Sequence, residues 1–282
     1  GLALNQVSAL STNMMILKVL NDENKDGVYD QAYFPTTQLK LNQDVLNRVA
    51  WQARTRVFNR VTAQLPIYPD PSKPLLVVDL AEDLVKNNKG IDGIMLNAEN
   101  RLACVFQNKA VLESNCQSDL NAVTDLSDAI QKRISPYLNS SNSQKFYLQL
   151  SYPDTESQSL KSVVHALNHD FSLINFEINS LENPKRLKSF IEQLKNFSAL
   201  EKTKLMVTLN NDNIKSQKEW QLLSEQLQRL QRAGIQKLAL SHYDFDNAQQ
   251  VHRHLYTPLS LNPGALLYRD PFQIDSKQGV KK

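Results

Sequence analysis

Short apolar or β-branched runs alternate along this chain with longer stretches in which apolar residues recur at helical spacing. Seven of the short runs have the length of strands, at residues 14–20, 60–67, 93–97, 146–151, 172–179, 204–210 and 237–243. Strands separated by helical stretches are typical of βα units that share one parallel sheet. The pattern therefore predicts an α/β fold.

Five of the longer stretches predict helices, at residues 44–58, 76–86, 122–134, 184–194 and 218–233. In the last of them, the apolar residues that recur along one helix face are Trp220, Leu223, Leu227 and Leu230. Gly234 follows where a left-handed C-terminal cap belongs.

Seven strands with crossover helices fit a (β/α) TIM-like barrel that is short of one strand. A Rossmann sheet is the alternative, but the sequence has no Gly-x-Gly-x-x-Gly fingerprint and only 7 glycines in 282 residues, too few for a glycine-rich phosphate cradle. We therefore expect residues 1–282 to form one incomplete barrel, open between the strands at 14–20 and 237–243, and we expect no nucleotide cofactor.

Composition narrows the functional classes. The 32 basic and 29 acidic residues nearly balance, so no strong field draws the chain toward nucleic acid or a membrane. No apolar stretch approaches the roughly 20 residues of a membrane span, and the N-terminus lacks the basic and apolar regions of a signal peptide. The abrupt opening GLALNQVSAL predicts a piece of a longer protein.

The stretch NDENKDGVYDQAYFP begins like an EF-hand loop. Asp22, Asn24 and Asp26 stand at ligand positions, and Gly27 stands at the sharp turn. The twelfth position, which needs a bidentate Glu, is Tyr33, and a strand-like run precedes the loop instead of a helix. The pattern favours an Asp- and Asn-rich turn at a strand end, with weak cation binding as the alternative.

In a (β/α) barrel, the carboxyl ends of the strands and the loops after them form the working face. The polar residues expected there are Asp22, Asp26, Tyr68, Asp70, Asn97, Glu99, Tyr152, Asp154, Glu177, Asn179 and those at positions 210–212 and 242–246. Carboxylates, amides and tyrosines suit a sugar, whose hydroxyls need many hydrogen-bond partners and whose ring faces stack on aromatic rings. The alternative is an ordinary set of polar loops.

One stretch is more specific. The sequence YFPTTQLKLNQDVLNRVAWQARTR, at residues 33–56, together with the acidic turn before it, resembles the C-terminal glycoside-hydrolase-like domain of the periplasmic poly-N-acetylglucosamine deacetylases PgaB and HmsF. The residues that match this family's motifs are Phe34, Pro35, Arg48, Val49, Ala50, Trp51, Gln52, Thr55 and Arg56. Residues 79–96 and LQRAGIQKLALSHYDF also resemble it, whereas residues 146–210 match in pattern only.

Three departures from the family matter. The family's leading strand is missing before Gly1, and the loop after the strand at 60–67 is shortened to YPDPSKP. Most importantly, the family's His-Asp-Asp is Asn97, Ala98 and Glu99 here, and Cys104 stands where the resemblance implies a catalytic Asp. Glycoside hydrolysis needs two positioned carboxyl groups, and a thiol does not replace one of them.

The resemblance implies a barrel that binds partly deacetylated poly-N-acetylglucosamine during biofilm export, without hydrolysis. The substrate-binding residues we expect are Asp22, Asp26, Tyr33, Glu99, Glu177, Tyr243 and Asp244. Two alternatives stay open: an endo-glycosidase that uses Glu99 and Glu177, and a structural docking domain. The implied partners are the polymer, an N-terminal deacetylase domain outside this chain and an outer-membrane porin, and the implied location is the periplasm, at the outer membrane through the parent protein.

Three further expectations concern single residues. Cys104 and Cys116, in a stretch that reads as a loop, form either a disulfide, which the family's periplasmic setting allows, or two unrelated thiols. His165 and His169 are four residues apart on a predicted helix, but no zinc pattern accompanies them, so a solvated face is favoured over a metal site. We expect Trp51 to pack against the barrel.

Overall fold

The computed structural model describes residues 13–57, 60–98, 102, 115–138, 145–153, 159–167, 171–212 and 214–242. Seven parallel strands form its main sheet, in the order β1 (Met14–Lys18), β5 (Arg60–Pro66), β6 (Gly93–Asn97), β7 (Lys145–Ser151), β8 (Leu173–Ile178), β9 (Leu205–Leu209) and β10 (Lys237–Leu240). Each coincides with one of the seven predicted strands, to within a few residues at the ends. The predicted α/β fold with one parallel sheet is confirmed.

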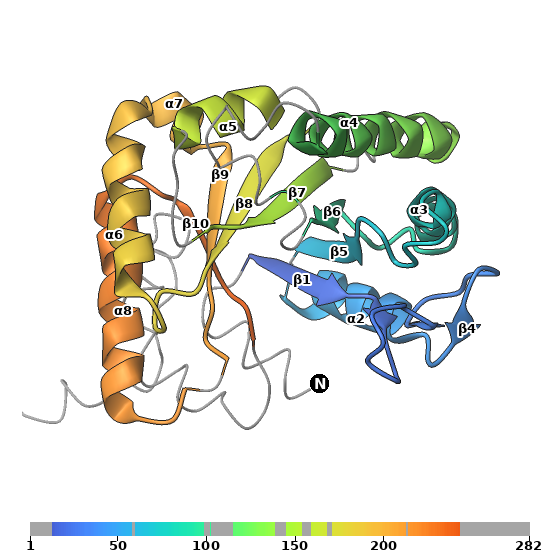
Figure 1. The fold of residues 1–282 in the computed structure, drawn as a ribbon. Coiled ribbons are helices and arrows are strands. Elements are labelled where there is room, and N and C mark those ends of the chain that lie inside the picture. The colour runs from blue at the N-terminus through green and yellow to red at the C-terminus, as the bar shows by residue number, and fades with distance from the viewer. Residues whose placement is uncertain are drawn as a thin grey trace, which may run out of the picture.

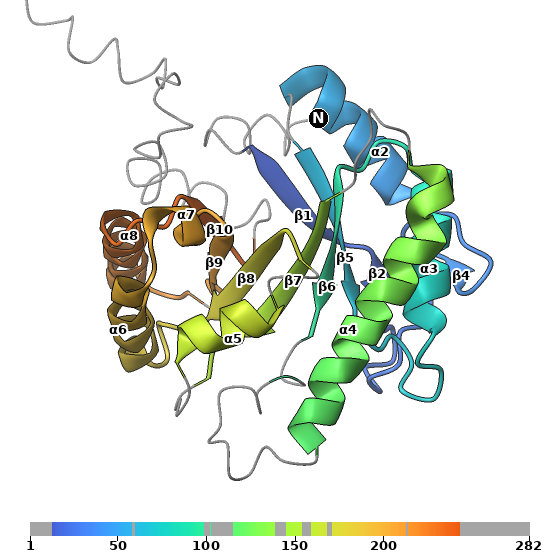
Figure 2. The ribbon, with the colours of Figure 1, turned by 90° about the horizontal axis from the view of Figure 1, so that it is seen from above.

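The sheet is curled, with helices on its outer side (Figure 1, Figure 2). The helices are α2 (Val45–Gln52), α3 (Leu76–Asn87), α4 (Asn115–Ile134), α5 (Leu160–Leu167), α6 (Pro184–Gln193), the short α7 (Ala199–Lys202) and α8 (Gln217–Arg232). β1 and β10 are the two edge strands, and within the described part of the chain no further strand pairs with either of them. The molecule is an incomplete TIM-like barrel, open where the sequence predicted.

Two helices differ clearly from their predicted bounds. The predicted helix at 44–58 is α2 followed by a π-helical turn, Ala53–Val57. α4 begins at Asn115, earlier than expected, so the backbone of Cys116 is helical and the prediction that Cys116 lies in a loop is wrong. α8 ends as predicted, because Gly234 adopts a left-handed φ of 94° and its amide donates to the Gln231 carbonyl. No helix in the described residues is both long and apolar enough to cross a membrane.

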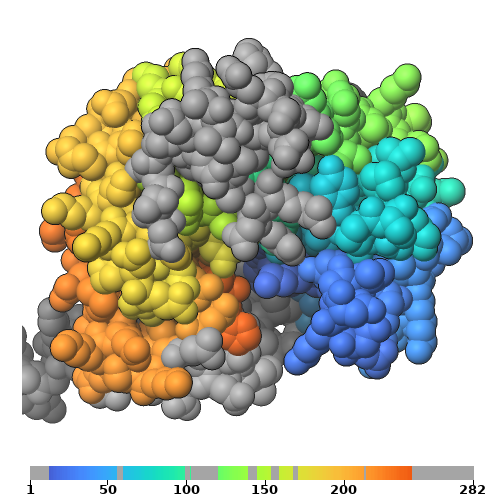
Figure 3. Space-filling model, in the orientation of Figure 1, coloured from blue at the N-terminus to red at the C-terminus, as the bar shows by residue number. Residues whose placement is uncertain are grey.

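Strand alternation gives the sheet two different faces. The face toward the helices carries the main core, in which strand residues such as Val61, Leu148 and Phe176 are packed together with Leu84 and Leu227 of the helices. The opposite face carries a smaller cluster of four buried residues, Met95, Tyr147, Leu173 and Met206. In the space-filling view, the N-terminal elements (blue to green) and the C-terminal helices (yellow to orange) form the two sides of the molecule (Figure 3).

A hairpin leaves the carboxyl end of β1. β2 (Leu20–Asn21) pairs antiparallel with β3 (Gln31–Ala32), which pairs in turn with β4 (Lys40–Leu41). The acidic stretch is the loop of this hairpin. Asp22 accepts hydrogen bonds from the amides of Asp26 and Gly27, and Asp26 accepts one from the amide of Val28. The loop is thus an Asp-rich turn at a strand end, as the sequence indicated.

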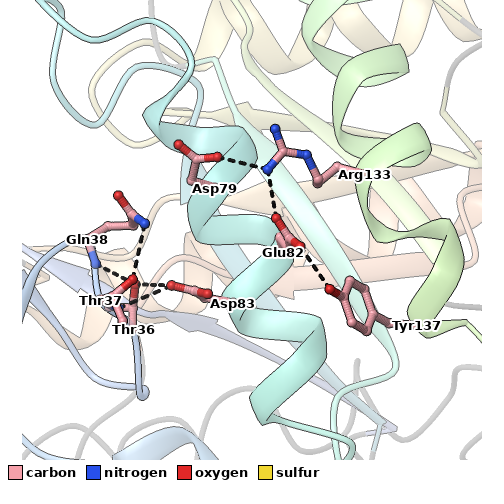
Figure 4. A network of polar contacts seen from close by, with 8 residues as sticks. All are labelled: Thr36, Thr37, Gln38, Asp79, Glu82, Asp83, Arg133 and Tyr137. Atoms are coloured by element: carbon pink, nitrogen blue, oxygen red, sulfur yellow. Dashed lines mark hydrogen bonds and ion pairs between the residues drawn. The ribbon is translucent and has the colours of Figure 1, made fainter.

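Polar contacts tie α3 to its neighbours on both sides (Figure 4). On one side, Arg133 of α4 pairs with Asp79 and Glu82, and the Tyr137 hydroxyl donates to Glu82 at 2.9 Å. These two donors lower the pKa of Glu82, and the same carboxylate raises the pKa of Tyr137. On the other side, Asp83 accepts hydrogen bonds from Thr36 and Thr37, which lie between β3 and β4.

The predicted packing of Trp51 against the barrel is wrong. The buried residues of this segment are Leu46, Ala50 and Ala53, which share one face of α2 and the following turn. Trp51 comes one residue after Ala50, about 100° around the helix, and 62% of it is exposed. The buried tryptophan of the described chain is Trp220 of α8, which is 5% exposed.

Candidate functional site

Polar side chains gather on the face of the sheet that points away from the helices. Gln64 of β5, Gln149 of β7, Asn175 of β8 and Thr208 of β9 are all buried there, one residue further along their strands than core residues such as Ala63 and Leu148. Buried amides cost free energy unless they are hydrogen-bonded, so their partners define the arrangement.

These residues form a continuous hydrogen-bonded row across four strands. The Oε1 atom of Gln149 accepts from Nε2 of Gln64 and from Nδ2 of Asn175, both at 2.9 Å. Asn175 and Thr208 are joined by contacts of 2.9 and 3.0 Å. The row bridges β5 and β7 across β6, which is what the curl of the sheet permits.

Glu177 lies at the carboxyl-end side of this row. It is half-buried on β8, two residues after Asn175 and therefore on the same face. Its Oε2 atom accepts a hydrogen bond of 2.7 Å from Nε2 of Gln149, and its Oε1 atom accepts one of 3.4 Å from Nδ2 of Asn210. The carboxylate is thus held from both sides by amide donors.

A second carboxylate lies beside Glu177. The Nδ2 atom of Asn210, directly after β9, also donates to Oδ2 of Asp212 at 3.3 Å, and the Asp212 amide donates back to Asn210. One amide nitrogen therefore bridges the two acids. The Ser241 hydroxyl, directly after β10, donates to Asp212 at 3.3 Å. The ends of β7 to β10 therefore build a single polar site.

The structure places the two hairpin acids, Asp22 and Asp26, in hydrogen bonds within their own loop. Asp22 is half-buried and Asp26 exposed, and their carboxylates accept backbone amides of their own loop. The hairpin lies at the carboxyl end of β1 and is tied to the loop after β5 through the Tyr29 amide and the Pro69 carbonyl, at 2.9 Å. Tyr33 is half-buried directly after β3, and its carbonyl accepts from the amide of Leu46.

Asp70, in that same loop after β5, also makes its contacts within its own loop. Its carboxylate accepts from the hydroxyl and the amide of Ser72 and pairs with Lys73 at 3.1 Å. These contacts, those of Ser72 first, lower the pKa of Asp70. The group therefore shapes its own loop.

Several predicted residues lie outside the described residues, namely Glu99, Cys104, Tyr243, Asp244 and His169. The side chain of Cys116 is likewise not described. His165 lies on α5, where its ring contacts Glu201 at 3.2 Å. In the described ranges, no three His, Cys, Asp or Glu side chains are grouped so that they could hold a metal ion.

Sequence reasoning chose Glu177 as a binding residue and expected positions 210–212 on the working face. It did not choose as binding residues Gln149 and Asn210, whose side-chain amides donate to Glu177. Positions 210–212 carried a signal, because they directly follow a predicted strand. Gln149 carried a weaker one: it is a polar residue inside the apolar run FYLQLS, and such a residue needs a partner.

The chain is similar to known proteins in part of its sequence and in its fold. The family model "Hypothetical glycosyl hydrolase family 13" matches residues 1–127. The structure of the PgaB (BpsB) glycoside hydrolase domain from Bordetella bronchiseptica superposes with a TM-score of 0.68 and 14% sequence identity, over 92% of this chain and 91% of that one. Morphinone reductase in complex with tetrahydroNAD superposes with a TM-score of 0.43 and 9% identity, over 84% of this chain and 76% of that one. No curated protein sequence matches the chain.

Residues 1–127 thus match a glycosyl hydrolase family model, and the described part of the chain has the fold of an incomplete (β/α) barrel. In this fold, the chain is similar to the PgaB glycoside hydrolase domain.

Proposed function

We propose that this domain binds partly deacetylated poly-N-acetylglucosamine without hydrolysing it. The observation that carries the proposal is the position of Glu177, a half-buried carboxylate on the face away from the helices, held by Gln149 and Asn210. A fixed carboxylate at the carboxyl end of a barrel strand suits the ammonium group of a glucosamine unit, because a charge-assisted hydrogen bond is stronger than a neutral one.

Two further observations support the choice of polymer. The chain shares its fold with a domain described as the PgaB glycoside hydrolase domain. Residues 33–56 resemble the poly-N-acetylglucosamine deacetylase family, whose setting supplies the rest of the proposal: the periplasm, a deacetylase domain and an outer-membrane porin as partners. The absence of hydrolysis rests on Cys104, which stands where the resemblance implies a catalytic Asp.

Calorimetric titration tests the binding. Glucosamine oligomers should bind more tightly than N-acetylglucosamine oligomers of the same length, and Glu177→Gln should weaken the binding of glucosamine oligomers by about tenfold, the worth of one charged hydrogen bond. Glu192→Gln is the matched control, since Glu192 lies on the outer helix α6 and its carboxylate pairs with Lys195. If the wild type and Glu177→Gln bind glucosamine oligomers with the same affinity, and the wild type does not distinguish them from N-acetylglucosamine oligomers, the proposal is wrong.

A second candidate function is glycoside hydrolysis, favoured by the Asn210 amide that bridges Glu177 and Asp212. Glycosidases use two carboxyl groups about 5–9.5 Å apart. Asp212 can supply the second acid, a role that the sequence alone assigned to Glu99.

An assay for new reducing ends separates the two functions. Under the binding proposal, wild-type protein incubated with partly deacetylated polymer releases none above background. Cleavage that is lost in both Glu177→Gln and Asp212→Asn would establish the second candidate in its place.

A further inference from the structure

The direction of the Gln149 amide is fixed by its neighbours. Its Oε1 atom faces two N–H donors, those of Gln64 and Asn175, at 2.9 Å each. Turning the Gln149 amide over would place its NH₂ group against two other NH₂ groups, with no acceptor between them. The carbonyl of Gln149 therefore faces the row, and its NH₂ group faces Glu177.

A buried sulfur prevents the whole row from reversing together. Sδ of Met95, a residue with no exposed surface, lies 3.6 Å from Nε2 of Gln64 and 4.0 Å from Nδ2 of Asn175. A thioether sulfur accepts hydrogen bonds weakly and donates none. It favours the NH₂ groups of Gln64 and Asn175 on its side, which leaves only the carbonyl oxygen of Gln149 to face them.

We infer that Gln149 is a positioning residue that holds the side chain of Glu177 in place as a hydrogen-bond acceptor, and that Gln149 is itself oriented by Gln64, Asn175 and Met95 behind it. For its effect on ligand binding, this inference rests on the proposed function. In that setting, the row supplies a carboxylate that is already in place when a cationic sugar arrives, which lowers the cost of ordering it.

The first test needs no ligand. Thermal unfolding is measured for the wild type, Gln149→Leu, Glu177→Leu and the double variant. Gln149→Leu should lower the unfolding midpoint more in the wild-type background than in the Glu177→Leu background. The reason is that only in the wild-type background does the Glu177 carboxylate lose its closest donor. Thr62→Val, a buried change on the same face whose hydroxyl contacts Met14, is the control for general damage. Equal lowering in both backgrounds would overturn the inference.

A second measurement keeps Gln149 intact and so does not depend on the folding of its variants. In the Glu177→Gln variant, the ¹H–¹⁵N resonances of the Gln149 side-chain amide should move, because its acceptor changes from a charged to a neutral oxygen. Those of Gln226, whose amide contacts Ser180, should stay in place. An unmoved Gln149 resonance would also overturn the inference.

The third measurement is glucosamine-oligomer affinity. Gln149→Leu should weaken binding by about tenfold in the wild-type background, as expected for the loss of a charged hydrogen bond, and should have no effect in the Glu177→Leu background. A wild-type protein that binds no glucosamine oligomer contradicts the proposed function, and the inference is then decided by unfolding and resonance shifts alone. Binding that requires Glu177 but ignores Gln149 contradicts the inference and leaves the function standing.

Discussion

Asp83 of α3 accepts hydrogen bonds from the Thr36 hydroxyl at 2.7 Å and from the Thr37 backbone amide at 3.2 Å. On the next turn, Nδ2 of Asn87 donates to the Pro35 carbonyl at 2.9 Å. Two stretches that resemble the deacetylase family therefore contact each other directly. They are the aromatic-Phe-Pro step, which ends at Pro35, and helix α3, which contains Glu-Asp-Leu.

Asp83→Ala should lower the free energy of unfolding by about 1–3 kcal/mol, because the change removes a charged acceptor shared by two donors. Asp83→Asn, which keeps one acceptor oxygen, should cost less. Denaturant unfolding measures both. The control is Glu192→Gln, at an ion pair whose side chains are 67% and 69% exposed, and it should change stability by no more than about 0.5 kcal/mol. If Glu192→Gln costs as much stability as Asp83→Ala, Asp83 has no special role.

The two tryptophans of the chain form a matched pair. Trp220→Ala should cost about 3–5 kcal/mol, as expected for a large truncation in the core. Trp51→Ala should stay within about 0.5 kcal/mol, because the Trp51 side chain is mostly exposed on α2 and Ala suits a helix. Unfolding curves of the two variants decide this. A large loss of unfolding free energy in Trp51→Ala would show that the Trp51 side chain packs in the core.

Glu201 makes stability depend on pH. Hydrogen bonds from the Ser198 backbone amide and the Ser198 side chain, followed by those from His165 and Lys161, hold the pKa of Glu201 down at about 2. A lowered folded-state pKa adds stability that is fully present above the unfolded value of about 4.3 and is lost as the pH falls through the folded value. Glu201→Gln should therefore lower the free energy of unfolding at pH 7. The difference between the wild type and the variant should shrink as the pH falls from about 4.3 to about 2.

Urea unfolding of the wild type and Glu201→Gln at pH 7 and pH 3 measures that narrowing. The same difference at both pH values would show that Glu201 acts through shape and not through its charge.

Gly93 has no room for a side chain. A Cβ at this position would lie 2.9 Å from the Lys145 carbonyl oxygen and 2.9 Å from Cε2 of Tyr147. Gly93→Ala should therefore cost about 1–3 kcal/mol, by forcing β6 and β7 apart. Gly27→Asn is the contrast: Gly27 has a φ of 88° with open space around it, and Asn tolerates left-handed backbone, so the loss should stay below about 1 kcal/mol. Unfolding midpoints of both variants test the difference.

The sequence by itself determined the seven strands, the order of βα units and the buried face of α8, because these depend on local periodicity. It also determined the Asp22 turn and the Gly234 cap, whose chemistry lies within a few residues. It contained the signal against a buried Trp51 as well, since Leu46 and Ala50 mark the buried face of α2, but a large apolar residue outweighed that signal in our prediction.

Only the tertiary structure decided which polar residues meet. Gln64, Gln149 and Asn175 come from three strands far apart in the chain, and their contacts depend on strand register and on the curl of the sheet. Periodicity states which face of its strand a residue occupies, but not which residue on another strand faces it. The contact of Asn210 with Glu177 likewise arises where β8 and β9 end side by side, because the packing of the two strands sets that distance.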